Sequence, residues 1–224
     1  GSSMFRPLLT ILGLSLGLAA HAAQDDVKIN GCTLAPGANC AGMDLRNADL
    51  SNMDLRRINF NGADLSGADL RHANLDLASL EEANLSQANL TRASLQQARL
   101  RMANLYKARL VGINAWGMVA PAVRAEKADF RGANLQFARL SGGKLLRANF
   151  EAADLEMAWF NRADMTRTNM SDANLQEAKF GETNMQKAVM TGARRHYATF
   201  VGTYMEGCRD CPHGWEKNIY SKAN

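Results

Sequence analysis

The residues best suited to chemistry lie near the C-terminal end, where two cysteines and a histidine fall close together. Cys208, Cys211 and His213 resemble part of a metal site, and the Cys-x-x-Cys pair alone has the spacing of a redox site. Zinc needs a fourth ligand, and a redox pair needs a strand–helix context that the flanking residues do not suggest. We therefore favour a structural disulfide over a metal or redox role, and we expect no metal and no cofactor.

Catalytic residues are not evident elsewhere. Neither His72 nor His196 has a nucleophile or carboxylate at a spacing that indicates a catalytic mechanism. The sequence contains no glycine-rich phosphate loop and no Ser/His/Asp set. We predict that the protein is not an enzyme and assign no catalytic residue.

A five-residue period dominates the chain from residue 38 to residue 205. A large apolar residue, here called the centre, occupies every fifth position, as Leu65, Leu70 and Leu75 show. A small residue, usually Ala, lies two positions before each centre, and Asp or Asn usually lies between them. Neither an α-helix nor a strand sustains a period of five, so each unit is expected to turn a corner and to bury its apolar residues by stacking on neighbouring units.

This pattern, A-(D/N)-L-x-x, resembles that of the pentapeptide-repeat family. The resemblance implies an all-β fold, a right-handed quadrilateral β-helix with four units per coil and about eight coils in all. Neighbouring coils should lie about 4.8 Å apart, the usual spacing of paired strands. Residues twenty apart in the sequence should then lie over one another on the same face.

One segment, residues 111–125, departs from the pattern. Its centres are Ala115, Ala120 and Ala125, which are too small to fill the interior. Large residues stand at its usual Ala positions and keep the five-residue phase, so we favour a distorted coil over an extruded loop. Pro121 lacks an N–H group for pairing, which predicts a local bulge.

The ends of the chain suggest export. Residues 1–3 are interpreted as an expression scar, and residues 4–22 as a signal peptide with cleavage after Ala22; a short membrane anchor is the alternative. We therefore expect a bacterial periplasmic or secreted protein. Residues 23–37 should form an N-terminal cap segment, and residues 206–224 a C-terminal cap or tail, with Trp215 and Tyr220 covering the last coil.

Four cysteines in an exported protein favour disulfides. In the rod that the resemblance implies, Cys32 and Cys40 lie at one end, and Cys208 and Cys211 lie at the other. Bridged Cα atoms lie within about 7 Å of each other, so we expect Cys32–Cys40 and Cys208–Cys211 bonds. Both would hold a terminal coil, where an open β-edge invites association.

The charge balance is mildly basic, with 26 Lys and Arg against 22 Asp and Glu over the whole chain. The branch of the family that mimics DNA and protects gyrase is strongly acidic, so that function becomes a minor alternative. Stacking at twenty residues aligns a row of cations two positions after the centre. The predicted anion- or partner-binding residues are Lys107, Lys127, Arg147, Arg167 and Lys187, with Lys144 on the same face. A solvated charged face without a ligand is the alternative.

A second column is apolar. The predicted partner surface consists of Leu77, Trp116, Phe137, Met157 and Trp159. Rows of exposed apolar residues can mark a contact with another protein or a second copy of the chain. We predict a non-catalytic, exported binding solenoid for an unknown protein or an anionic envelope polymer. A purely structural or dimerising envelope protein is the alternative, and we do not expect nucleic acid as a ligand.

Overall fold

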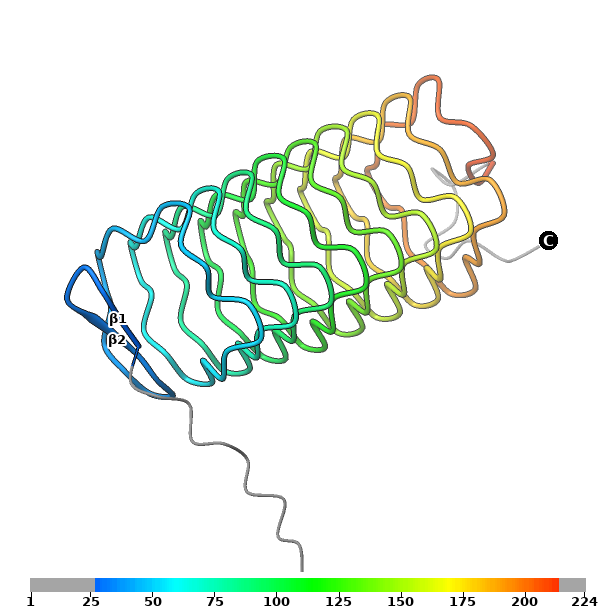
Figure 1. Cartoon of the computed structure of the whole chain (residues 1–224). Coiled ribbons are helices and arrows are strands. Elements are labelled where there is room, and N and C mark those ends of the chain that lie inside the picture. Colours follow the sequence, from blue (N-terminus) through cyan, green and yellow to red (C-terminus); the bar gives the residue numbers. More distant parts are fainter. Residues whose placement is uncertain (1–26, 214–224) are drawn as a thin grey trace, which may run out of the picture.

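The fold is a single long coil that winds into a four-sided rod (Figure 1). The computed structural model describes residues 27–213. It begins with a short antiparallel hairpin of two strands, β1 (Val27–Ile29) and β2 (Cys32–Leu34). The chain then winds through parallel bridges that each join residues twenty apart, from Asn39↔Asn59 to Val189↔Arg209. The predicted right-handed quadrilateral β-helix is confirmed, and the described residues contain no helix.

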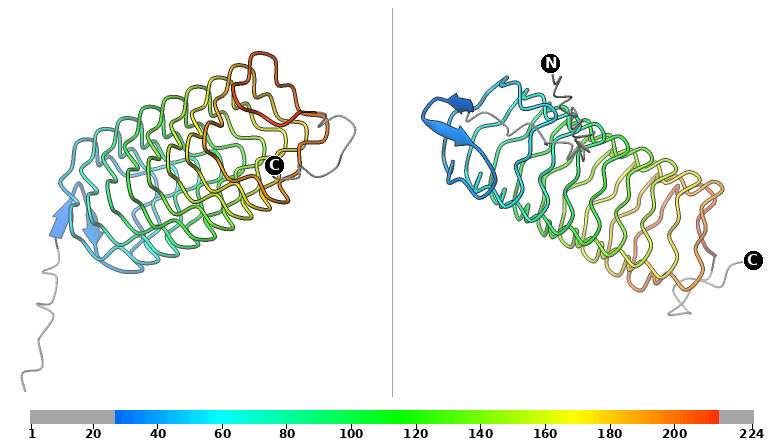
Figure 2. Two further views of the ribbon diagram at one scale, coloured as in Figure 1. Left: turned by 90° about the vertical axis from the view of Figure 1, so that its right-hand side faces the viewer. Right: turned by 60° about the horizontal axis from the view of Figure 1, so that its bottom comes forward.

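Hydrogen bonds between coils hold the rod together. The N–H group of Leu65 donates to Asn84 of the next coil (2.7 Å), and the N–H group of Asp64 donates to Met43 of the previous coil (2.9 Å). Figure 2 shows the coils stacked along the rod in two further views. Each coil alone has no sheet to join, so the rod is stable only as a stack.

Every unit turns its corner in the same way. The N–H group of Ala68 donates to the carbonyl of Leu65 (3.0 Å), which closes a four-residue turn. The third residue of this turn has a positive φ, and so does every fifth residue from Gly37 to Gly207. This is the geometry of a type II turn, which favours glycine at that place. We call it the turn position.

The turn position allows a paired stability test. Ala152 (φ 56°) and Gly132 (φ 64°) occupy it in neighbouring coils of one column, and a Cβ added at Gly132 would meet nothing within 4 Å. Relief of backbone strain outweighs the added freedom of the unfolded chain, so we expect Ala152→Gly to stabilise the fold by about 0.5–1 kcal/mol. Gly132→Ala should destabilise it by a similar amount. Urea unfolding measures both, and shifts of the same sign would contradict the strain argument.

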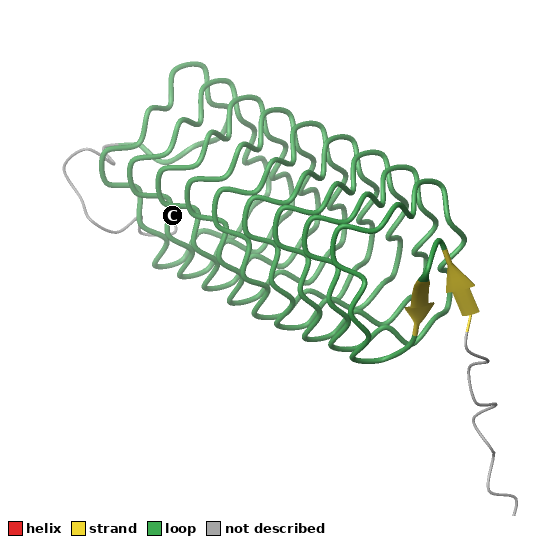
Figure 3. Ribbon diagram, turned by 90° about the vertical axis from the view of Figure 1, so that its left-hand side faces the viewer, coloured by secondary structure: helices red, strands yellow, loops and turns green. Residues whose placement is uncertain are grey.

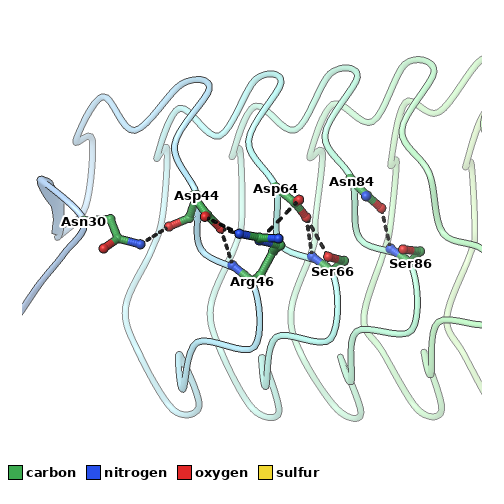
Figure 4. Close-up of polar contacts among 7 residues, drawn as sticks. All are labelled: Asn30, Asp44, Arg46, Asp64, Ser66, Asn84 and Ser86. Carbon is green, nitrogen blue, oxygen red and sulfur yellow. Dashed lines mark hydrogen bonds and ion pairs between the residues drawn. The ribbon is translucent and has the colours of Figure 1, made fainter.

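The Asp or Asn before each centre fixes the same turn from its side chain. Asp64 Oδ1 accepts a hydrogen bond from the backbone N–H of Ser66 (3.0 Å), and Asn84 Oδ1 accepts one from that of Ser86 (3.0 Å). Figure 4 shows this ladder on one face, where Arg46 also pairs with Asp44 at 2.8 Å. Local bonding of this kind explains why the repeat prefers Asp and Asn.

The core is a narrow column of centres and small corner residues. Each centre from Leu45 to Met190 is buried. Phenylalanines stack in the C-terminal half, with ring centroids 5.2 Å apart for both Phe160–Phe180 and Phe180–Phe200. Stacked phenylalanines therefore join the leucine and methionine centres in the C-terminal half of the interior.

Residues 111–125 form three sides of a regular coil, neither distorted nor extruded. Val119 bridges Arg99 below and Arg139 above, as in every other coil. Met118 and Ala120 are both fully buried, so the large and small residues have exchanged places. The exchange keeps the total side-chain volume roughly constant, which is why the register survives.

The predicted bulge at Pro121 is wrong. Pro121 occupies the second residue of its turn, ahead of Ala122 at φ 55°. Proline is favoured there because its fixed φ suits the turn. Its carbonyl still accepts a hydrogen bond from Met102 (3.0 Å), so the inter-coil pairing is uninterrupted.

The N-terminal end is closed by the β1–β2 hairpin, seen as two arrows in Figure 3. Asn30 and Gly31 link its strands, both with positive φ, as a two-residue hairpin turn requires. Asn30 Nδ2 donates to the carbonyl of Asp44 in the first coil (2.7 Å). The hairpin therefore bonds directly to the rod that it covers.

Disulfides join Cys32 to Cys40 and Cys208 to Cys211, with Cα separations of 5.2 and 5.8 Å. The signal peptide at residues 4–22 and the lid that includes Trp215 and Tyr220 lie outside the described residues. Nowhere in residues 27–213 is there a helix with the length and apolarity of a membrane span.

Candidate binding surface

The five cations of the predicted row lie on one face of the rod. They are Lys107, Lys127, Arg147, Arg167 and Lys187, here called the basic strip. All five occupy the turn position, with φ between 53° and 59°, and all are exposed. Each backbone N–H donates to the next coil, as Arg147 does to Thr166 (2.9 Å). Because residues 111–125 keep the register, Lys107 remains in line with the other four.

The basic strip has no internal carboxylate partners. Across residues 27–213, no ion pair includes any of its five side chains. Two like charges about 4 Å apart repel each other by roughly 1 kcal/mol in water, and salt reduces this. The row is therefore a concentrated, unneutralised positive charge that an external anion would relieve.

Six arginines outside the strip are already paired with carboxylates in the described residues, namely Arg46, Arg56, Arg71, Arg101, Arg131 and Arg162. Arg71 donates to Asp69 at 2.7 Å, and this side-chain hydrogen bond holds the pKa of Asp69 below its usual value. Burial raises the pKa of Asp129, but the hydrogen bonds from Arg131 outweigh it and the pKa is lowered. Arg71 and Arg131 each pair with a carboxylate two residues earlier in the same turn, whereas the cations of the basic strip have no such partner.

Further cations flank the strip. Arg124 and Lys144 form a bridged pair on the same face, and both are exposed. Glu126 also lies on this face, between Tyr106 and Leu146 of the adjacent coils. Lys144 therefore lies beside the basic strip.

The predicted apolar surface divides into parts. Trp116 and Phe137 contact each other, with ring centroids 5.6 Å apart, and Phe137 is 47% exposed. Met157 lies above Phe137 in the same column and is half-buried. Leu77 lies in this column too, but Gln97 and Gly117 separate it from Phe137. The continuous part therefore consists of Trp116, Phe137 and Met157.

Trp159 lies on the next face and belongs to a mixed column. The Lys179 ammonium lies 4.5 Å from its ring centroid, and the Arg139 guanidinium lies 5.4 Å from it. These two cation–π contacts occupy the ring, while 41% of the residue remains exposed. The sequence analysis missed this arrangement, although the twenty-residue spacing of Arg139, Trp159 and Lys179 would have revealed it.

The cysteine and histidine motif offers no metal site. Cys208 and Cys211 are bonded to each other, so neither thiolate is free. Within residues 27–213 no group of three or more His, Cys, Asp and Glu side chains is arranged to hold a metal ion.

Comparison with known proteins identifies the repeat. The family model described as pentapeptide repeats matches in eight copies, over residues 38–76, 78–114, 128–167 and 168–207. No curated protein matches the sequence. The internal unmatched interval 115–127 overlaps residues 111–125, whose large and small residues are exchanged.

Solved structures give further matches. QnrB1, a plasmid-mediated fluoroquinolone resistance protein, matches with a TM-score of 0.62 and 18% identity, over 78% of this chain and 91% of that one. HetL, involved in heterocyst differentiation regulation in the cyanobacterium Nostoc sp. strain PCC 7120, is 27% identical over 76% of this chain and 82% of its own, with a TM-score of 0.38. The likeness to QnrB1 concerns the fold alone.

Proposed function

Because this chain belongs to the pentapeptide-repeat family, we propose that it is a non-catalytic binding solenoid whose basic strip holds an anionic polymer of the bacterial envelope. The observation that carries this proposal is the row of five exposed cations without carboxylate partners. Export to the periplasm or cell surface is part of the proposal, and it rests on the signal-like residues 4–22.

The geometry of the strip suits a repeating anion. Coils about 4.8 Å apart place five charges along roughly 20 Å, so one extended polymer can contact several of them at once. Multiple contacts raise the overall affinity far above that of one ion pair. Lipopolysaccharide phosphates and teichoic-acid chains have the required chemistry.

The test compares binding to immobilised lipopolysaccharide and teichoic acid. We expect Arg147→Glu/Arg167→Glu to weaken binding at least tenfold and to reduce its salt dependence, because two central contacts become repulsive. Arg57→Glu/Arg92→Glu is the matched control, since these arginines also occupy turn positions but lie on other faces.

Equal weakening in both variants would show that net charge alone governs binding, which contradicts the strip. Unchanged binding in Arg147→Glu/Arg167→Glu would also contradict it. Each variant should retain the wild-type unfolding midpoint, which circular dichroism checks.

A protein partner or a second copy of the chain is the second candidate. The exposed contact between Trp116 and Phe137 favours it, because soluble proteins seldom leave adjacent large aromatic residues uncovered without a use. A DNA-mimic function has less support, because the chain carries a formal net charge of +4.

A further inference from the structure

A hollow of about 310 Å³ lies beside the basic strip, where three successive coils meet a corner. Its lining includes Glu126 from the lower coil, Gly142, Gly143 and Lys144 from the middle coil, and Arg162 from the upper coil. Neither the sequence pattern nor the proposed polymer binding assigns a role to it.

Gly142 keeps the hollow open. A Cβ at Gly142 would project into space with nothing within 4 Å, so this turn position presents bare backbone where most other units carry a larger side chain. Gly143 faces the interior instead, where a Cβ would come within 2.9 Å of the Leu140 carbonyl oxygen and 3.4 Å of the buried Val123 side chain. A compact ligand can approach this backbone closely.

Glu126 provides an unsatisfied anion. Its Oε2 atom is shielded from solvent and has no hydrogen-bond partner in the structure. A shielded carboxylate oxygen has lost its hydrogen bonds to water, and without a donor in the protein this loss is not compensated. A hydrogen bond from a ligand would compensate for it. A ligand whose N–H group meets this oxygen, after a rotation of the half-buried Glu126 side chain, would therefore gain affinity.

Positive charge lies in the same hollow but does not pair with Glu126. Across the described residues, Lys144 has no ion pair, and its side chain is exposed. Arg162 donates through Nε to Glu182 at 2.9 Å, which leaves its terminal nitrogens without that partner. Asp164 Oδ1 is occupied by the backbone N–H (3.1 Å) and hydroxyl (2.6 Å) of Thr166.

The hollow is thus lined by two carboxylates, Glu126 and Asp164, and two cations, Lys144 and Arg162. Glu126 and Lys144 do not pair with each other, whereas Arg162 is paired with Glu182. We propose that it binds a compact zwitterion, whose primary ammonium group donates to Glu126 and whose phosphate or carboxylate lies against Lys144 and Arg162. The site is independent of the basic strip, because none of the five strip residues lines the hollow.

The test titrates the intact protein with O-phosphoethanolamine and β-alanine by calorimetry and NMR. We expect saturable binding of at least one probe at about 1 mM or tighter. Phosphocholine should bind at least tenfold more weakly than O-phosphoethanolamine, because its trimethylated ammonium cannot donate a hydrogen bond. Vesicles of phosphatidylethanolamine show whether the ligand is a free small molecule or a lipid headgroup. Binding of O-phosphoethanolamine without binding of the vesicles indicates a soluble ligand, and binding of the compound and of the vesicles indicates a lipid headgroup.

Two variants locate the ligand. Glu126→Gln should weaken binding at least tenfold, whereas Glu177→Gln, an exposed turn-position glutamate on another face, should not. Gly142→Gln should abolish binding by filling the hollow, and Gln87 shows that a turn position accepts glutamine.

Three results would overturn the proposal: no saturable binding of either probe, equal affinity for phosphocholine, or unchanged affinity in Glu126→Gln. Loss of binding in Arg147→Glu/Arg167→Glu would also overturn it, since the ligand would then lie on the strip. Failure of the polymer experiment leaves this test unaffected.

Discussion

Phe180→Ala is expected to destabilise the protein by about 3–5 kcal/mol, because it empties a fully buried position in the aromatic core. Phe180 stacks between Phe160 and Phe200, with centroids 5.2 Å away on either side. The coils above and below are fixed by their hydrogen bonds, so the cavity cannot collapse easily. Urea unfolding followed by circular dichroism measures the loss.

Phe137→Ala is the matched control, because Phe137 is the same residue type on the outside of the rod. Its loss removes one exposed contact with Trp116, so the destabilisation should stay below about 1.5 kcal/mol. Similar losses at the two positions would show that the phenylalanine ladder is not a principal source of stability.

Much of the fold could be predicted because one local rule repeats. The period of five determines which residues face inward, and parallel pairing at twenty residues then places every side chain on a face. The basic strip followed directly from that register, since Arg147 and Arg167 lie in consecutive coils. The same regularity made the burial of the centres predictable.

The errors arose where one residue was considered without its place in the turn. Pro121 was judged as a strand residue that lacks a donor, although it is the second residue of its turn, a place that proline suits. The Asn30–Gly31 dipeptide is a strong hairpin signal, but it lies outside the repeat and was not recognised. Trp159 was grouped with Phe137 and Met157, although the count of five places it in the next unit, and so on the next face.

The hollow could not be predicted from sequence. It depends on the conformation of Glu126 and Arg162 and on the absence of a side chain at Gly142. The sequence contains these three residues but does not show that they leave an unpaired carboxylate oxygen. A site formed by the space between side chains can be found only in a three-dimensional structure.

The exchanged coil offers the second large effect. Met118→Ala alone should cost about 2–4 kcal/mol, because it leaves a cavity at a fully buried position. Ala120→Leu alone should cost about 1–3 kcal/mol, because the inserted side chain must compete with Met118 for the same interior. The double variant restores the A-x-L pattern of the other units and should be close to the wild type in stability.

The free energies of unfolding of the four proteins form a double-mutant cycle. We expect a coupling energy of at least about 2 kcal/mol in favour of the double variant, since each change fills or relieves the space that the other affects. Additive losses would mean that the two positions do not share one space, and the explanation of the regular coil would fail. A positive coupling would show that the interior of this rod specifies a volume for each unit, and that the position of the large residue within the unit is a secondary choice.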